Sequence, residues 1–267
     1  MFKAWEKYPD AFPRLVGAVP MQCSALRFSD CYKDTASEVQ VSSTWLPGNT
    51  NPLWEHFQNH KEGHGIFKWE HYFEAYHRHL SKFVGRGPNV LEVGIYSGGS
   101  LEMWRSYFGE NCHVYGVDIE HACKAYETKY ISVFVGDQAD REFWKSLRGD
   151  VQSIDILIDD GGHTVDQQRV TLEEMLPHLR AGGVYVCEDI HGRHNRFAAF
   201  AAELVSELNR MNLVSGSVLQ SAASHFQSAI HSIHFYPYLL VIEKHDVART
   251  KLMAPRRGTK WQPFPLL

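Results

Sequence analysis

The chain has 267 residues, of which 44% are hydrophobic and 22% are charged, and its formal net charge at pH 7 is -4. This length is enough for one substantial domain with an extra N-terminal layer, and the composition is that of an ordinary globular protein. The small negative charge offers no basic surface for a nucleic-acid backbone. We therefore expect no nucleic-acid partner.

The N-terminal residues and the cysteines indicate the compartment. Residues 1–12 mix charged with apolar side chains, unlike a secretion signal, and no later stretch is apolar for long enough to span a bilayer. The five cysteines include no C-x-x-C pair, which fits a reducing environment. The sequence therefore predicts a cytoplasmic protein without a membrane segment.

The first part of the chain changes from irregular to periodic. Residues 1–65 contain frequent prolines and several tryptophans without a clear period, and we interpret them as an arm or lid that packs on the main domain or on a neighbouring subunit. Aromatic residues then recur at helical spacing over 69–83, which predicts an amphipathic helix. A short buried strand is expected over 89–94, followed by a glycine-rich turn and a helix over 100–108.

The rest of the chain alternates between strand and helix patterns. Strands are expected over 113–117, 131–135, 154–158 and 184–187, with helices over 140–147, from Thr164 to Leu179, and over 197–211. Thr164 and Gln167 form a capping-box signature, and residues 180–183 are expected to form a turn.

The last two expected strands define the end of the sheet. Residues 230–236 and 239–243 are separated by two residues, so these strands must pair antiparallel. The whole pattern predicts an α/β fold with a doubly wound, Rossmann-like, mostly parallel seven-stranded sheet and a C-terminal antiparallel hairpin. The main domain is expected over 66–248, and the tail over 249–267 is either loose or an intersubunit arm.

Polar residues follow the first three strands, where an open parallel sheet binds its ligands. The turn from Glu92 to Ser100 has the spacing G-x-x-x-G-G rather than the G-x-G-x-x-G of dinucleotide-binding proteins, so it suits a cofactor without phosphate. Asp118 follows the second strand, where an acid can bind both hydroxyls of a ribose. Asp137 and Gln138 follow the third and could bind an adenine amine. Each feature alone also fits a tight turn or a helix cap; together they predict a nucleoside-binding rim.

Carboxylates follow the fourth and fifth strands. Asp160, Glu188 and Asp189 converge if these strands are neighbours, and clustered carboxylates favour a hard cation such as Mg²⁺. The alternative is that these acids cap helices or face solvent. His163 lies three residues after Asp160 and could remove a proton from an acceptor hydroxyl. His191 is the second candidate for this base.

We interpret the remaining histidines as structural residues without a role in catalysis. His56, His60 and His64 have the spacing of zinc ligands on a helix, but Gly63 and Gly65 indicate that the helix ends there. No H-E-x-x-H motif or cysteine completes a tetrahedral site, so we interpret them as part of a surface or lid. A second group is interpreted as packing at the polar edge of the aromatic helix: His71, His77 and His79.

Several motifs together resemble a known family. The segments Leu91–Gly94, Ser97–Trp104 and Val114–Asp118 resemble the cofactor half of class I methyltransferases. The segments Gly136–Gln138, Ile158–His163, Glu188–Asp189 and Ser232–Tyr236 are similar to the metal-dependent macrolide-sugar and rhamnosyl O-methyltransferases, a group that includes proteins named cephalosporin hydroxylases. The resemblance covers roughly residues 68–244.

The resemblance implies S-adenosylmethionine as cofactor and Mg²⁺ as metal. Cofactor binding is assigned to Glu92, Gly94, Ser97, Ser100, Asp118, Asp137, Gln138 and Asp159, metal binding to Asp160, Glu188 and Asp189, and the role of base to His163. Glu92, Gly94 and Asp118 would hold the methionine and ribose parts.

The resulting hypothesis is a Mg²⁺-dependent O-methyltransferase that acts on a hydroxyl of a small molecule, with a sugar on a glycosylated natural product as the first candidate acceptor. A phenol or catechol is the second candidate, because the same metal chemistry serves both. The same scaffold would also suit an NAD-dependent oxidoreductase, which the glycine spacing disfavours, or a non-catalytic protein that binds S-adenosylmethionine. We also expect a homo-oligomer.

Overall fold

The computed structural model describes residue 29 and residues 51–151, 153–192, 195–211, 220–255 and 257–258. The chain divides into two compact units, Met1–Thr50 and Asn51–Leu267, and all elements below belong to the second. Most of the N-terminal arm expected over 1–65 therefore lies outside the described residues, as does the end of the expected tail. The proposed domain boundaries remain predictions.

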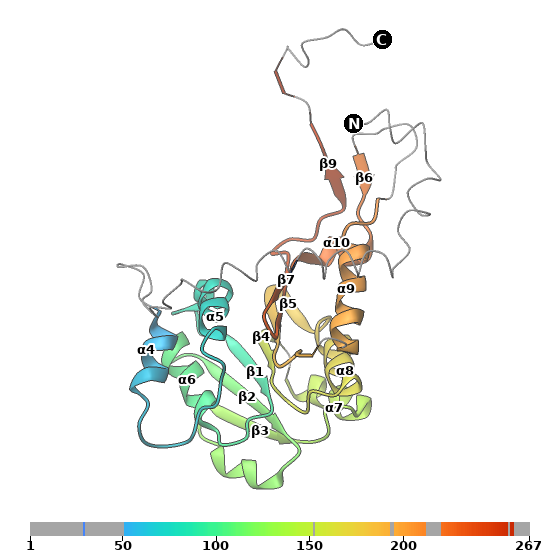
Figure 1. Ribbon diagram of the computed structural model, residues 1–267. Helices are drawn as coiled ribbons and strands as arrows, with labels where there is room; N and C mark the ends of the chain where they lie inside the picture. Colours follow the sequence, from blue (N-terminus) through green and yellow to red (C-terminus); the bar gives the residue numbers. More distant parts are fainter. Residues whose placement is uncertain are drawn as a thin grey trace, which may run out of the picture. The chain divides into compact units, whose positions relative to one another are not determined.

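The second unit is built on a seven-stranded sheet (Figure 1). Its strands are β1 (Asn89–Val93), β2 (His113–Asp118), β3 (Ile131–Val135), β4 (Ile154–Asp159), β5 (Leu179–Cys187), β7 (Ile230–Tyr236) and β8 (Leu239–Lys244). Their order is β3-β2-β1-β4-β5-β8-β7, parallel from β3 to β5 and antiparallel from β5 to β7. This confirms the Rossmann-like fold with a C-terminal hairpin. The strand order reverses between β1 and β4, so the ligand crevice of such a sheet lies at their carboxyl ends.

Helices cover both faces of this sheet (Figure 1). One face packs on α4 (Pro52–Asn59), α5 (Tyr72–Leu80) and α6 (Gly99–Phe108), and the other on α7 (Arg141–Asp150), α8 (Val165–Met175) and α9 (Arg196–Leu208). The central strands β1 and β4 are buried on both faces, and their sequences are mostly apolar, with Glu92 and Asp159 near their carboxyl ends. The shorter elements are η3 (Ser81–Phe83), η4 (His121–Tyr126), α10 (His225–Ala229) and the antiparallel pair β6 (Gln220–Ala222) and β9 (Lys251–Met253).

Capping residues explain where two of the helices begin. Thr164 and Gln167 form the expected capping box at the start of α8. The sequence patterns missed α4, which is only eight residues long. Its cap is Asn51, whose side chain accepts hydrogen bonds from the backbone of Leu53 and Trp54, and Pro52 occupies the first helical position.

Several expected boundaries differ from the structure; the helix expected to reach Leu179, for example, ends at Met175. The aromatic helix begins at Tyr72 rather than at residue 69, so Trp69 precedes it and remains 49% exposed. The turn expected over 180–183 lies inside β5, where the pairing with β4 shifts in register. The tail segment Lys251–Met253 pairs with β6 instead of being loose. The apolar periodicity is weakest at these places, so backbone pairing and packing decide the ends.

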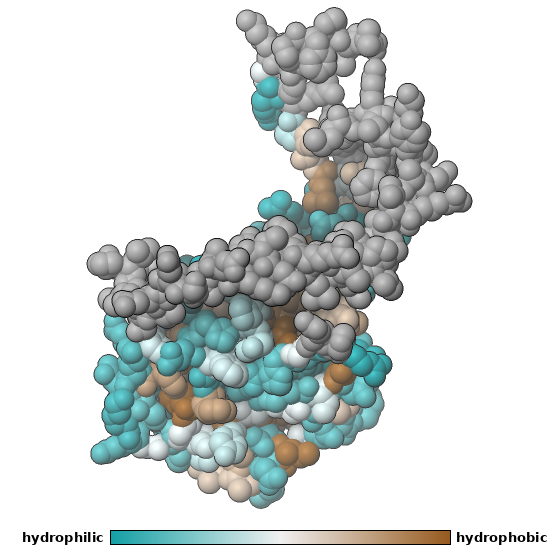
Figure 2. All heavy atoms as spheres, viewed as in Figure 1, coloured by the Kyte–Doolittle hydropathy of each residue, from teal (hydrophilic) through white to brown (hydrophobic). Residues whose placement is uncertain are grey.

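The described surface is mixed in character. On the face seen in Figure 2, hydrophilic residues predominate and hydrophobic ones form separate patches. Within the ranges the structure describes, every helix is too short or too polar to cross a bilayer.

Candidate active site

A cavity of about 1010 Å³ opens at the carboxyl ends of β1 to β5. This volume is at the upper end of the range for small-molecule sites, about 300–1,000 Å³. The loop before α5 forms one wall. The predicted site residues that line the cavity are Gly94, Ser97, Ser100, Asp118, Asp137, Gln138, Asp160, His163, Glu188 and Asp189. Glu92 and Asp159 lie behind its wall, with at most 1% of either residue exposed.

The glycine turn after β1 brings the first and fourth strand ends together. Gly94 has a φ of 81°, and a Cβ at this position would lie 2.1 Å from the backbone oxygen of Asp160. Only glycine fits here, because the side chain of any other residue would collide with the β4 loop. Asp118 is fixed opposite this turn: its carboxylate accepts hydrogen bonds from the backbone N–H groups of Tyr96, at 3.1 Å, and Glu120, at 2.9 Å.

The amide of Gln138 is already engaged by the protein. Its Oε1 accepts from the backbone N–H of Gly162 at 2.6 Å, and its Nε2 donates to Asp159 at 3.0 Å. Tyr185 also donates to Asp159, at 3.2 Å. Burial raises the pKa of Asp159 to about 7 despite these donors. The structure therefore gives Asp159 a position behind the wall that supports Gln138, rather than one in the cavity lining where it could bind cofactor.

The raised pKa of Asp159 predicts a pH dependence of stability. A carboxyl whose pKa rises on folding, here from 3.8 to about 7, holds its proton more tightly in the folded protein. The contribution of this carboxyl to the free energy of unfolding is full below pH 3.8 and is lost as the pH rises towards 7. We expect the free energy of unfolding from urea titrations to fall more steeply between about pH 5 and pH 7 in the wild type than in Asp159→Asn. Asp155→Asn, on the same strand, should keep the wild-type slope; equal slopes in all three proteins would contradict the assignment.

Lys68 is the residue that sequence reasoning missed at the centre of the carboxylates. Its Nζ lies 2.7 Å from Asp160, 2.9 Å from Glu188 and 3.3 Å from Glu92, and only 3% of its side chain is exposed. Burial alone would lower the pKa of Lys68, but the carboxylates raise it well above its usual value. Burial and the charge of Asp160 raise the pKa of Glu188 to about 8, against the opposing effect of Lys68.

Asp160, which contacts Lys68, also belongs to a group of three potential metal ligands. One ligand atom from each of Asp160, His163 and Asp189 lies within 4.8 Å of the others. The Nε2 of His163 is 3.7 Å from Asp189 and 4.0 Å from Asp160. Glu188, predicted as a metal ligand, is outside this group and contacts Lys68 instead.

The loop before α5 and α5 itself orient Asp189. Its Oδ1 accepts hydrogen bonds from the Nε1 of Trp69 at 3.0 Å and from the hydroxyl of Tyr72 at 2.8 Å. The tyrosine hydroxyl also accepts from the backbone N–H of Asp189 at 3.2 Å. Lysine, tryptophan and tyrosine in an aromatic segment have no diagnostic spacing, so no sequence pattern indicates this wall.

Backbone strain is concentrated around the cavity. In the described part of the chain, the non-glycine residues with positive φ are Tyr96, His163, Asp189 and Tyr238. The first three line the cavity, and the backbone oxygen of Tyr238 accepts a hydrogen bond from Tyr72 at 3.1 Å. Such conformations cost about 1–3 kcal/mol each and collect at functional sites.

Comparisons with known proteins agree with this geometry. Residues 91–190 match the family model described as a methyltransferase domain. The 8-demethyl-8-alpha-L-rhamnosyl tetracenomycin-C 2'-O-methyltransferase of Streptomyces olivaceus is 31% identical over 202 residues, which are 68% of this chain and 52% of that protein. The demethylmacrocin O-methyltransferase of Streptomyces fradiae is 38% identical over 133 residues, or 46% of this chain and 33% of that protein.

A solved structure shares the fold. The MycE methyltransferase from the mycinamycin biosynthetic pathway, in complex with Mg and SAH, is 25% identical, with a TM-score of 0.60 over 73% of this chain and 54% of that one. The chain thus spans about half, or less, of the length of the relatives described here.

Proposed function

Because the chain belongs to the class I S-adenosylmethionine-dependent methyltransferases related to the macrolide-sugar and rhamnosyl O-methyltransferases, we propose that it transfers a methyl group to a hydroxyl of a glycosylated natural product. One observation supports this proposal most directly. The predicted nucleoside-binding residue Asp118 lines the same cavity as the acid–base cluster of Asp160, His163 and Asp189. A cofactor and an acceptor can therefore lie side by side.

The rim supports S-adenosylmethionine as the methyl donor. Asp118 lines the cavity at the end of β2, where two backbone N–H groups hold its carboxylate, and the glycine turn removes side chains from the approach to β1. Ser97, Ser100 and Asp137 also line the cavity. Glu92 acts indirectly in this proposal, since its carboxylate accepts from the Ser100 hydroxyl at 2.7 Å and from Lys68.

The donor chemistry of the cluster fits a divalent cation. Asp160 and Asp189 provide the carboxylate oxygens that Mg²⁺ prefers, and His163 lies beside both. Asp160 and Asp189 would hold the ion, with Glu188 acting through Lys68. A bound cation would supply Lewis-acid stabilisation of a negative charge on the acceptor oxygen.

His163 acts as the general base in this proposal. In the proposed reaction, its Nε2 takes the proton of the acceptor hydroxyl while the oxygen forms a bond to the methyl carbon. The carbon–sulfur bond breaks, and its electron pair stays on sulfur. Asp160 and Asp189, within 4.0 Å of the Nε2, stabilise the imidazolium that results.

The exposed side chains at the cavity mouth support an acceptor with a large apolar body. Phe67 is 92% exposed, Tyr96 79% and Ile119 64%, and all three line the cavity. Together with the half-exposed Trp69 they offer an apolar surface, with three aromatic rings, on which sugar rings and a fused-ring aglycone both pack.

The proposal is tested first by binding. Calorimetry should detect S-adenosylhomocysteine but not NAD, and Asp118→Asn should weaken binding about tenfold to hundredfold, because a hydrogen bond to a charged group is worth about 1.5–3 kcal/mol. Glu120→Gln is the matched control, since the residue contributes only its backbone N–H to Asp118. Binding of NAD in preference to S-adenosylhomocysteine would reject the proposal.

Activity is tested with a set of glycosylated and phenolic acceptors and mass spectrometry of the products. A methylated glycoside should form, its formation should stop with EDTA, and Mg²⁺ should restore it. Methylation of phenols alone would assign a phenolic acceptor instead. Binding of S-adenosylhomocysteine without product from any acceptor would favour a non-catalytic protein.

A further inference from the structure

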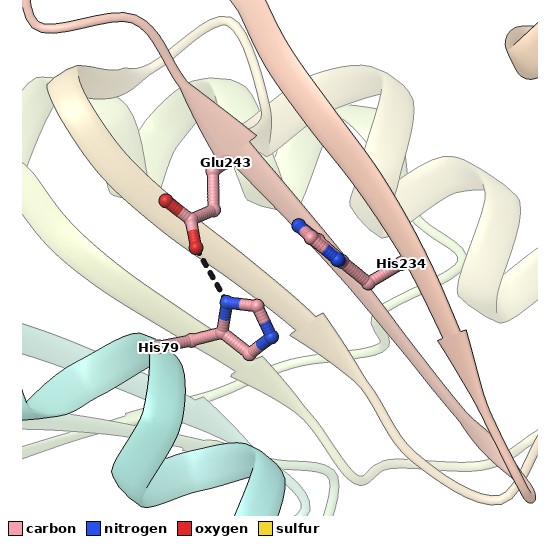
Figure 3. A group of neighbouring side chains, drawn as sticks. All are labelled: His79, His234 and Glu243. Atoms are coloured by element: carbon pink, nitrogen blue, oxygen red, sulfur yellow. Dashed lines mark hydrogen bonds and ion pairs between the residues drawn. The ribbon is translucent and has the colours of Figure 1, made fainter.

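A second group of potential metal ligands lies away from the cavity, between α5 and the C-terminal hairpin. His79 projects from the end of α5, His234 from β7 and Glu243 from β8, and the three side chains converge (Figure 3). One ligand atom from each lies within 4.8 Å of the others. The Nδ1 of His79 contacts Glu243 directly. None of the three lines the cavity described above.

The surroundings resemble those of a metal site. Histidines that bind metals use their other ring nitrogen in a hydrogen bond that fixes the ring. The Nε2 of His79 lies 2.8 Å from the hydroxyl of Tyr236, and the Nε2 of His234 lies 2.9 Å from the hydroxyl of Ser232. Only 5% of the His79 side chain and 20% of that of Glu243 are exposed, and His234 is partly buried, so the group is partly shielded from bulk water; the other oxygen of Glu243 accepts from Lys82 at 3.2 Å.

The chemical types of the three potential ligands indicate which metal ion they would bind. Two imidazoles and one carboxylate match the three-protein-ligand sites of Zn²⁺, which leave a fourth position for water. Ligand atoms in such a tetrahedron lie roughly 3.3 Å apart, given Zn–N distances of about 2.0–2.1 Å. The three ligand atoms lie within 4.8 Å of one another, so small side-chain movements, including an opening of the direct His79–Glu243 contact, bring them to this spacing.

We propose that His79, His234 and Glu243 form a binding site for Zn²⁺ or a similar transition-metal ion, which braces α5 against β7 and β8. The brace stabilises the wall of the cavity, because Tyr72 and Tyr238, which contact each other, lie on α5 and in the β7–β8 turn. The site is separate from the proposed Mg²⁺ position and does not depend on the proposed activity.

Zinc binding to the purified chain tests this directly. The protein is stripped with EDTA, dialysed into excess Mg²⁺ to fill oxygen-rich sites, and titrated with Zn²⁺. We expect one tight equivalent and a rise in Tm of roughly 5 °C at a zinc concentration about one hundred times Kd. Co²⁺ in place of Zn²⁺ should give the visible absorption of a tetrahedral site.

Variants then assign the site. His234→Ala should remove the tight equivalent, and Tyr236→Phe should weaken it about tenfold or more, as expected for a residue that only orients a ligand. His77→Ala on α5 is the matched control and should keep it. A wild-type protein without tight zinc binding, or tight binding that persists in His234→Ala, would overturn the proposal. Loss of zinc in Asp160→Asn but not in His234→Ala would also overturn it, because the ion would then belong to the cavity.

Discussion

Replacing Lys68 with methionine should lower the free energy of unfolding in EDTA by about 3–5 kcal/mol. The Lys68 ammonium is almost fully buried and contacts three carboxylates, of which Asp160 and Glu188 are at 2.7 and 2.9 Å. Methionine fills a similar volume but removes the charge, so the carboxylates repel one another or must take up protons. Urea titration monitored by circular dichroism measures the change.

The matched control is Lys145→Met. Lys145 also forms an ion pair, with Glu142 at 3.1 Å, but 70% of its side chain is exposed. A surface pair of this kind contributes about 0–1 kcal/mol. If Lys68→Met cost no more than Lys145→Met, the carboxylates would not depend on Lys68, and its central position in the site would be rejected.

Replacing His163 with alanine should reduce kcat by about 10²–10⁴, the usual contribution of a general base, with the acceptor found in the screen. The Kd for S-adenosylhomocysteine should stay within about twofold, because the cofactor rim lies at β1 to β3 rather than at His163. Single-turnover rates and calorimetry separate the two quantities.

His191→Ala distinguishes the two candidate bases. His191 lies outside the cavity lining, with its ring 5.9 Å from that of Tyr238, so its removal should leave kcat nearly unchanged. A large loss in His191→Ala together with a mild effect of His163→Ala would reverse the assignment. Weak cofactor binding in His163→Ala would instead indicate that this residue supports the rim.

The strand ends show how far the sequence alone could reach. Asp118, Asp160 and His163 were identifiable because each follows closely on a strand whose apolar run is unambiguous. In a parallel sheet the carboxyl ends of strands share one edge, so the positions follow from order alone. Glu92 and Asp159 belong to the same ends but point behind the wall, and the direction of a single side chain there depends on packing.

The opposite wall of the cavity could not be derived in this way. Lys68 lies 92 residues before its partner Asp160, and Trp69 and Tyr72 lie 120 and 117 residues before their partner Asp189. Their contacts form only when α5 docks on the sheet beside the hairpin. Similarly, the sequence indicates only polar-edge packing for His79. Its contact with Glu243 and its proximity to His234 arise from the packing of α5 against β7 and β8.

The sequence by itself determined the strand–helix alternation, the class of fold and the row of polar residues at the strand ends, because these follow from local periodicity and chain order. Only the tertiary structure decided which carboxylates face the cavity, which of them Lys68 contacts, and which histidines meet. Those outcomes depend on long-range packing, since burying a charge is tolerated only where a partner from elsewhere in the chain reaches it.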